Sequence, residues 1–473
     1  MKHTKKIIFI VPNYSSRSIR KWGIKKTAGK KKDFECYPPL GLLYLAGSIK
    51  KNTNFEICIL DAKANQWSLE ELEVAIINES PDIVGITVTS FTLYQTFNII
   101  KNILNNLTNK PLIILGGPHI SKRPEDIEIF GADYGFIGDS EISILQFLDY
   151  YFGSGNIDNV NGLVYRKEGK IIVNPIYLSE DINKFALPDR TLVNSELYYF
   201  SITPGKLTSM LTSRGCPFNC IYCSVPHKRE YHFRKIDDVL DEIKQIKNQG
   251  YEYINFSDDV FTIKKERIIE LCSRLIEEKI EINWGCATRA DLVDLELLKL
   301  MKKAGCIDIR IGIETGSEKI RNEVMGKKIS DGAIRDAIMN IKKAKLLAVG
   351  FFLIGIPGET KKDIESTIKF ACSLPLDFAS FNLVTPLPGS RLYEIALKEN
   401  KIENNIWKKI IEGDRTPPVY IPDGLDMTYL EQMIKTAFRK FYIRPTYLFS
   451  QLVQIRSWND LLHKIKIAKR LLF

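Results

Sequence analysis

Short apolar runs alternate with longer amphipathic segments over the first 150 residues. Segments 40–50, 69–78 and 91–107 have helical spacing. Between them the pattern predicts five short buried strands: Ile7–Val11, Glu56–Leu60, Ile83–Val88, Leu112–Leu115 and Tyr134–Ile137. Strands alternating with helices predict an α/β fold, here a doubly wound, Rossmann-like parallel sheet over residues 1–150. Ligands on such sheets bind at the carboxyl ends of the strands, so the loops there hold the candidate site residues.

A second series of strands and helices follows a stretch of different character. Residues 151–206 predict a linker, with a small hairpin at 162–174 that turns at Glu168-Gly169. Residues 207–389 predict six strand–helix units and hence a partial TIM barrel, (βα)6, with its site at the strand carboxyl ends. The predicted strands are Leu207–Ser213, Tyr253–Phe256, Ile282–Thr288, Ile307–Ile313, Val349–Ile354 and Ala379–Val384.

Residues 390–473 predict a helical C-terminal region. Its last segment, Trp458–Phe473, alternates apolar and basic residues at helical spacing. Two interpretations stay open: a helix that packs its apolar stripe on its own domain, and a helix that makes peripheral contact with a membrane surface.

Composition narrows the class of protein. The 473 residues are 45% hydrophobic, and no apolar run is long enough to cross a bilayer. The apolar stretch Ile7–Pro12 is too short for a signal peptide, so we expect a cytoplasmic enzyme. The net charge of +10 is spread along the chain without arginine–aromatic interleaving, so we expect no nucleic-acid partner. Nine cysteines, an odd count, argue against a disulfide framework.

Three of the cysteines are clustered as Cys216, Cys220 and Cys223, a CxxxCxxC spacing. Thiolates are soft ligands that suit iron–sulfur clusters. A cubane normally takes four ligands, so three cysteines would leave one iron open to a substrate. Structural zinc needs four closed ligands, and no second cysteine pair exists. His227 or His232 would complete a Cys3His site, which keeps zinc as an alternative.

This motif resembles the hallmark of the radical S-adenosylmethionine (SAM) superfamily, CxxxCxΦC, with Tyr222 as the aromatic residue. The resemblance covers residues 207–388. It implies a 4Fe–4S cluster held by the three cysteines, whose open iron binds SAM and cleaves it reductively to a 5′-deoxyadenosyl radical. It also implies SAM contacts from residues that end the next three predicted strands. These are Asp258 at the methionine amino group, Arg289 at the methionine carboxylate, and Glu314 at the ribose or amino group.

The N-terminal sheet resembles the cobalamin-binding domain that is joined to one branch of this superfamily. The matching positions are Leu40, Gly41, Thr87, Thr89, Ser90, Gly116, Gly117, His119 and Glu141. Small glycines allow a nucleotide tail to lie against the sheet, and the hydroxyls offer polar contacts. The first strand is not followed by DxHxxG, so the resemblance implies cobalamin without a protein histidine on cobalt, and His119 as a loop or tail contact. A flavodoxin-like sheet that binds another ligand, or none, is the alternative.

Together the resemblances imply a cobalamin-dependent radical SAM enzyme that methylates an unactivated centre of a small organic substrate, with a flavodoxin or ferredoxin as reductant. The whole-chain pattern, including Arg439-Lys440-Phe441-Tyr442-Ile443-Arg444-Pro445, also resembles the anaerobic magnesium-protoporphyrin ester cyclase group, so radical cyclisation or ring rearrangement is the alternative. A transfer-RNA methylthiotransferase would carry three cysteines in its N-terminal domain, where this chain has only Cys36 and Cys58. A non-enzymatic iron–sulfur or zinc protein is the remaining alternative.

Overall fold

The chain forms two compact units in the computed structural model, which describes residues 5–13, 35–176, 182–203, 205–224, 231–413 and 417–453. His227 and the segment Trp458–Phe473 lie outside these residues. The first unit contains the first strand, Cys36–Tyr198 and the stretch that begins at Glu403. The second contains the described residues of Tyr199–Ile402 and residues 418–453. Of the predicted C-terminal region 390–473, the described residues up to Ile402 and from Pro418 to 453 therefore belong to the second unit, and those that begin at Glu403 belong to the first.

The first unit is built on a seven-stranded sheet in the order β3-β1-β4-β5-β6-β7-β8. Its five parallel strands are β1 (Lys6–Val11), β3 (Glu56–Asp61), β4 (Ile83–Thr87), β5 (Leu112–Gly116) and β6 (Tyr134–Phe136). This is the flavodoxin-like doubly wound order, which confirms the predicted fold. In that order the connections that follow β1 and β4 run in opposite directions along the sheet, and such sheets bind ligands at this point.

An antiparallel hairpin extends the same sheet through β7 (Leu163–Lys167) and β8 (Lys170–Val173). Glu168 and Gly169 occupy its turn with φ of 50° and 74°. Two successive positive φ angles define the primed turn that suits the twist of a hairpin. The predicted hairpin and its turn are confirmed.

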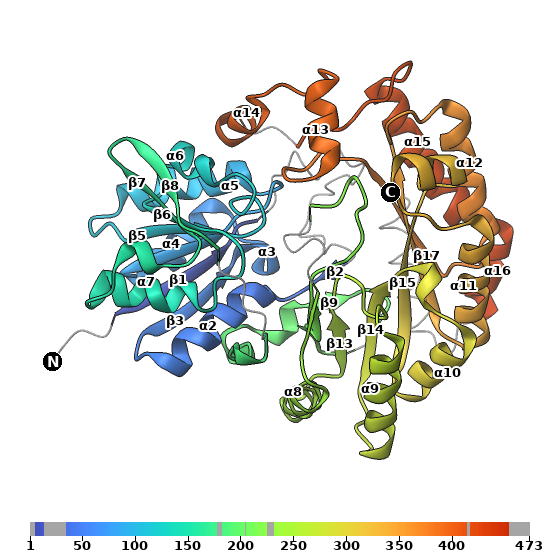
Figure 1. The fold of residues 1–473 in the computed structure, drawn as a ribbon, viewed down its shortest axis with the longest axis horizontal. Helices are drawn as coiled ribbons and strands as arrows, with labels where there is room; N and C mark the ends of the chain where they lie inside the picture. The colour runs from blue at the N-terminus through green and yellow to red at the C-terminus, as the bar shows by residue number, and fades with distance from the viewer. Residues whose placement is uncertain are drawn as a thin grey trace. The chain divides into compact units, whose positions relative to one another are not determined.

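Helices lie on both sides of this sheet (Figure 1). α2 (Leu40–Asn52) and α7 (Ser143–Phe152) share one apolar core with Phe9, Ile83 and Ile114 of the strands. The side chains between these on the strands, such as Ile8 and Val84, are buried toward the opposite face, as strand alternation requires. The remaining helices of this unit are α3 (Ala62–Asn65), α4 (Leu69–Glu79), α5 (Leu93–Asn98), α6 (Ile127–Phe130) and α14 (Ile406–Gly413).

The second unit is a six-stranded parallel sheet in sequential order, β10-β13-β14-β15-β16-β17. The strands are Leu207–Met210, Tyr253–Phe256, Asn283–Thr288, Cys306–Glu314, Leu347–Ile354 and Phe378–Leu383. The connecting helices are α8 (Ile236–Asn248), α9 (Lys265–Glu277), α10 (Leu295–Lys303), α11 (Asp331–Lys343) and α12 (Lys361–Ser373). α15 (Met427–Tyr442) packs against β17 and serves as the sixth helix (Figure 1). The predicted partial (βα)6 barrel is confirmed.

The barrel core lies between the strands and these helices. Ile309, Ile311 and Ile313 of β15 are fully buried there with helix residues such as Ile338. Shorter elements complete the described chain: β2 (Glu35–Cys36), β9 (Tyr199–Phe200), β11 (Ser213–Arg214), β12 (His232–Phe233), α13 (Arg391–Lys398) and α16 (Pro445–Val453). Within the described ranges, no helix combines the length and apolarity needed to span a membrane.

Candidate active site

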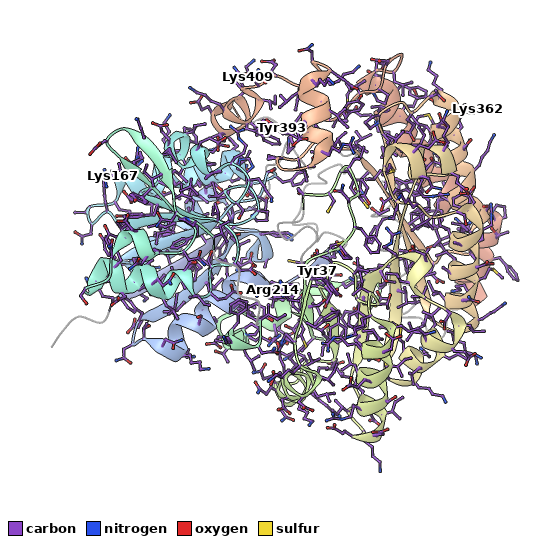
Figure 2. The ribbon with its side chains drawn as sticks, in the orientation of Figure 1. Tyr37, Lys167, Arg214, Lys362, Tyr393 and Lys409 are labelled. Carbon is purple, nitrogen blue, oxygen red and sulfur yellow. The ribbon has the colours of Figure 1, made fainter. Side chains whose placement is uncertain are left out.

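The cysteine motif occupies the loop that follows β11, beyond the carboxyl end of the first barrel strand. Gly215, at φ 94°, makes the turn that starts this loop, immediately after Arg214 (labelled in Figure 2). Cys216, Cys220 and Cys223 are half-buried, and none of them forms a disulfide. Burial raises the pKa of the Cys216 thiol, and the nearby negative charge of Asp259 raises it further. In the part of the chain that the structure describes, no three His, Cys, Asp or Glu side chains converge closely enough to hold a metal ion.

Ile221 anchors the motif in a small apolar cluster of its own, with Ile320, Met325, Ile356 and Leu392. Its N–H donates to the Met325 carbonyl at 3.2 Å, and its carbonyl accepts from the Leu392 N–H at 2.8 Å. Leu392 lies on α13, next to Tyr393 (labelled in Figure 2). The segment between the second and third cysteines is therefore fixed on both sides by backbone hydrogen bonds.

Tyr222, the aromatic residue of the motif, reaches the end of β15. Its hydroxyl donates to Glu314 Oε1 at 2.7 Å, and Lys327 Nζ donates to the same oxygen at 2.6 Å. All three side chains lie in the barrel unit, and Glu314 and Lys327 are buried. Burial, and next the charge of Glu314, raise the pKa of Tyr222 well above its usual value, so the phenol stays protonated. Lys327 was not among the predicted site residues, because nothing in Gly326-Lys327-Lys328 separates it from the other lysines of the sequence.

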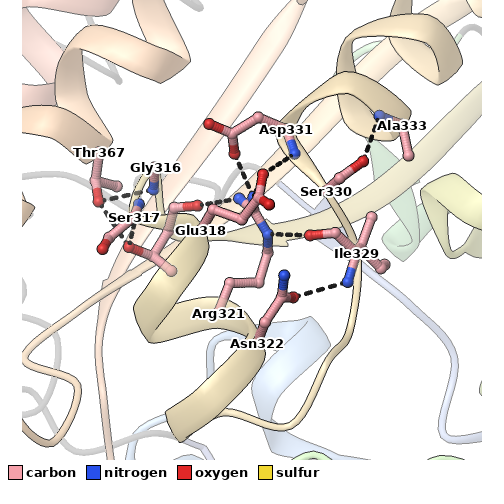
Figure 3. A network of polar contacts seen from close by, with 11 residues as sticks. Gly316, Ser317, Glu318, Arg321, Asn322, Ile329, Ser330, Asp331, Ala333 and Thr367 are labelled. Carbon is pink, nitrogen blue, oxygen red and sulfur yellow. Dashed lines mark hydrogen bonds and ion pairs between the residues drawn. The ribbon is translucent and has the colours of Figure 1, made fainter.

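The loop that carries Lys327 is held by a fully buried arginine, Arg321 (Figure 3). Its guanidinium donates to the carbonyls of Thr315 at 2.7 Å and Ile329 at 2.8 Å, and pairs with the Asp331 carboxylate. Arg321 therefore ties the start of the loop to its end, and Lys327 is fixed within the closed loop.

Asp258 has a different environment from the one predicted. It is buried, and its carboxylate accepts from the Thr212 N–H at 3.1 Å, from the Thr212 hydroxyl at 2.8 Å and from the Ser213 hydroxyl. Burial raises its pKa, and these hydrogen bonds partly offset the effect. Its oxygens are thus engaged in holding the backbone just before the cysteine motif. Its neighbour Asp259, the other carboxylate of the segment Ser257-Asp258-Asp259, is exposed, and its negative charge raises the pKa of Cys216; the sequence prediction chose Asp258 of the two.

Arg289 follows β14 and contacts the motif through Phe218, which lies between the first two cysteines. Its guanidinium lies 3.7 Å from the centre of the Phe218 ring. It also makes a bidentate pair with Asp291, at 2.9 and 3.0 Å, and donates to the Lys327 carbonyl at 2.8 Å. A cation on an aromatic face is favourable. Arg289 therefore lies beside the motif, and its guanidinium is also paired with Asp291.

In the first unit, the predicted glycines at the end of β5 have two different surroundings. Thr87 and Gly116 are register partners at the carboxyl ends of β4 and β5. A Cβ on Gly116 would meet no atom within 4 Å, so space is open above it. A Cβ on Gly117, at φ 95°, would lie 2.9 Å from the Val88 backbone. Gly117 is therefore required by the packing of the two strand ends, and Gly116 leaves room for a ligand.

His119 is part of the core of the first unit. It is 1% exposed; its Nδ1 lies 3.0 Å from the Ser90 hydroxyl and its Nε2 lies 2.9 Å from Asp126. Trp407 of α14 packs edge-on against the imidazole at 5.4 Å. Both ring nitrogens already have protein partners, so His119 is better suited to position Ser90 than to contact a cofactor directly.

The other predicted cobalamin residues border the same strand ends or the start of a helix. Leu40 and Gly41 begin α2; Gly41 is exposed, and a Cβ there would meet no atom within 4 Å. Thr89 is engaged with Thr92 in the turn that opens α5. Glu141 is buried, and its carbonyl accepts from Ser48 of α2 at 2.7 Å. A Cβ at Gly41 or Gly116 would meet no neighbouring atom, so the protein does not cover the backbone at either position.

Each of the two units contains a region that matches a known protein family. Residues 210–371 match the radical SAM superfamily, and residues 32–148 match the B12 binding domain. The chain is 31% identical to an uncharacterized methyltransferase of Pyrococcus horikoshii over 423 residues, 88% of this chain and 90% of that protein. The chain belongs to the radical SAM superfamily. The B12 match places it among the members with a cobalamin-binding domain.

Two further likenesses extend along nearly the whole chain. An anaerobic magnesium-protoporphyrin IX monomethyl ester cyclase of Rubrivivax gelatinosus is 27% identical over 94% of this chain and 78% of its own length. The structure of the radical SAM methyltransferase TsrM from Kitasatospora setae, solved with cobalamin and a 4Fe–4S cluster, superposes with a TM-score of 0.73. It covers 99% of both chains at 16% identity. The radical SAM enzyme class and the expected cofactors, 4Fe–4S cluster, SAM and cobalamin, are confirmed.

Proposed function

We propose that this radical SAM enzyme transfers a methyl group to an unactivated centre of a small organic substrate. The observation that carries the proposal is the presence of two elements in one chain: three clustered cysteines outside any disulfide after the first barrel strand, and a flavodoxin-like sheet whose strand end at Gly116 is uncovered. When bound, the cluster with SAM supplies the 5′-deoxyadenosyl radical, and cobalamin supplies the methyl group. The methyltransferase from Pyrococcus horikoshii supports this choice.

The residues of this chain hold and orient these groups. Cys216, Cys220 and Cys223 are the proposed cluster ligands, and Ile221 fixes the loop between them. Asp259, exposed in the loop that follows β13, is proposed at the methionine amino group in place of Asp258, because a carboxylate pairs well with an ammonium group. For the same reason Arg289 is proposed at the methionine carboxylate.

Glu314 and Tyr222 are proposed at the ribose side of SAM. Their hydrogen bond fixes the Glu314 carboxylate next to the cysteine loop. The ammonium group of Lys327 compensates the negative charge of Glu314 in the buried site. In the first unit, Leu40, Gly41, Thr87, Thr89, Ser90, Gly116 and Glu141 are proposed to line the cobalamin site. Gly117 and His119 are proposed to support it.

We infer a small-molecule substrate and a flavodoxin or ferredoxin as electron donor. We also infer a cytoplasmic location, because a reducing compartment keeps the cluster-binding thiols reduced. The same composition that lacks arginine–aromatic interleaving favours a substrate other than nucleic acid.

Anaerobic purification with cobalamin present tests the cofactor assignment. We expect four irons and one cobalt per chain, and SAM cleavage to 5′-deoxyadenosine after reduction. Cys220→Ala should lose iron and cleavage, whereas Cys372→Ala, a half-buried cysteine of α12, should keep both. Zinc in place of iron, or undiminished cleavage by Cys220→Ala, would contradict the proposal.

Product mass separates methyl transfer from the alternative. The cyclase relative supports ring closure or rearrangement with the same cofactors as the second candidate. A product heavier than the substrate by one CH2 supports methyl transfer. Formation of 5′-deoxyadenosine with a product that has not gained CH2 supports cyclisation or rearrangement instead.

A further inference from the structure

Polar side chains on three successive rows fill part of the inner face of the barrel. The Tyr253 hydroxyl donates to Asp308 at 2.6 Å, and Arg310 donates to the other Asp308 oxygen at 2.8 Å. Arg310 also donates to Asn255 Oδ1 at 2.6 Å. All four residues are buried. This part of the inner face therefore resembles the packed interior that is usual for barrels of this type.

The inner face nearer the carboxyl ends of the strands is different. Gly312, Phe351 and Ser380 are register partners on β15, β16 and β17, two residues beyond the row that contains Arg310. Phe351 is 36% exposed, although its strand has a neighbour on each side. Its sequence neighbour Phe352 points to the helix-covered core and is fully buried. Asn382, further along β17, is exposed as well. Solvent thus reaches an aromatic side chain on the inner face of a central strand.

This exposed surface adjoins the predicted SAM residues. A Cβ on Gly312 would collide with Glu314 Oε1 and would lie 2.7 Å from Lys327 Nζ. The Glu314–Lys327 pair therefore lies over Gly312, one strand away from Phe351. The same Glu314 oxygen accepts the hydroxyl of Tyr222, which precedes Cys223. Phe351 thus lies one strand away from the Glu314 carboxylate, which is hydrogen-bonded to Tyr222 of the cysteine loop.

We propose that Phe351, Ser380 and Asn382 form the subsite for a planar, uncharged part of the substrate; the proposal rests on the function proposed above. The Phe351 ring offers a stacking face. Asn382, whose amide donates to the Ser380 hydroxyl at 3.0 Å, offers polar groups at its edge.

The charged side chains around the subsite are paired with one another, so we expect the bound part of the substrate to carry no charge. Arg310 is paired with Asp308, Lys327 with Glu314 and Arg289 with Asp291. A carboxylate placed against Phe351 would lose its hydration and would have to compete with these pairs for a cation. Burial of a charge without such compensation is strongly unfavourable.

Binding of two matched probes to the reconstituted holoenzyme, measured by equilibrium dialysis, tests the proposal. Naphthalene carboxamide and naphthalene carboxylate share a planar ring and differ in charge. We expect the amide to bind at least about tenfold more tightly than the carboxylate. Phe351→Ala should weaken amide binding about fivefold, since the stacking face is lost. Phe449→Ala removes an aromatic ring that is 70% exposed on α16, and should leave binding unchanged.

Equal binding of the two probes, or unchanged amide binding by Phe351→Ala, would overturn the subsite. Phe351→Leu, which keeps an apolar side chain in the strand, serves if the alanine variant does not fold, and should also weaken amide binding. Iron, cobalt and SAM cleavage are measured on the same wild-type preparation. Cleavage without charge-selective probe binding rejects the subsite alone, and absence of cleavage rejects the proposed function.

Discussion

Tyr222 donates a hydrogen bond from its hydroxyl to Glu314 Oε1 across 2.7 Å, and so joins the cysteine loop to the end of the fourth barrel strand. The two residues are 92 positions apart in the sequence. Glu314 adopts φ 71°, an unusual backbone for a residue other than glycine, and this conformation accompanies the close approach. The hydrogen bond is the direct link between the loop that holds the cysteines and a residue proposed to contact SAM.

Tyr222→Phe should loosen that link. The phenol donates to a charged acceptor, so we expect a loss of about 2 kcal/mol in the free energy of unfolding. Iron should also leave the holoenzyme faster under a chelator, which absorbance at the cluster band measures. Tyr94→Phe, on α5 of the other unit, is the control and should change neither quantity. Identical iron-loss rates for wild type and Tyr222→Phe would count against the link.

Lys327→Met should be more severe, because it leaves the Glu314 carboxylate buried without its cation. Removal of one partner of a buried pair costs about 3 kcal/mol or more. The double variant Lys327→Met with Glu314→Gln should recover much of this loss, since no charge remains buried. Urea unfolding of the apoprotein measures both values. Lys328→Met, at the exposed next position, should be nearly neutral; a comparable loss there would mean that the ion pair is not the cause.

Glu359 should make stability depend on pH. It is buried after β16, where its Oε2 accepts from the Gly355 and Ile356 N–H groups at 2.7 and 3.1 Å, and burial raises its pKa to about 7. The unfolded chain releases this proton near the ordinary value of 4.5, so the folded state binds more protons between these values. Stability is therefore lost as the pH rises from about 4.5 to about 7, and stays low above that.

Glu359→Gln removes this titration and keeps an oxygen for the two N–H groups. Relative to wild type, the variant should gain up to about 3 kcal/mol in unfolding free energy between pH 5 and pH 8. Urea unfolding at several pH values measures the difference. A constant difference over the whole range would show that Glu359 titrates normally in the folded protein.

Gly117→Ala and Gly116→Ala form a matched pair in the first unit. Alanine at Gly117 combines a positive φ with a Cβ 2.9 Å from the Val88 backbone, so a loss of about 2 kcal/mol is expected. Alanine at Gly116 has open space and should change stability by less than about 0.5 kcal/mol. If cobalamin lies over Gly116, that variant should instead retain less cobalt, which metal analysis measures. Equal stability of the two variants would contradict the difference in their surroundings.

Several parts of the fold followed from local patterns alone. Both strand series, their helices and the hairpin turn at Glu168-Gly169 were predicted, because strand alternation and turn chemistry act over a few residues. The cysteine motif was located after the first barrel strand for the same reason: Cys216, Cys220 and Cys223 lie within eight consecutive positions. The spacing of short-range ligands is visible in a sequence.

Other features depend on contacts between distant segments, and only the tertiary structure revealed them. Asp258 is hydrogen-bonded to Thr212, whereas Asp259 is exposed, because the direction of each side chain after a strand depends on the loop packed against it. It also assigned α14 to the first unit, where Trp407 packs on His119 nearly 290 positions earlier. No local periodicity records such a return.

Local residue patterns were enough to indicate the type of chemistry, through three cysteines at fixed spacing and two series of strands whose carboxyl ends carry the polar loops. The side chains that surround this chemistry are set by the fold as a whole. Lys327 and Phe351 are ordinary residues in the sequence, and they become candidates because one is buried on Glu314 and the other is exposed on an inner strand. Burial and pairing arise from the whole fold, so neither can be read from local spacing.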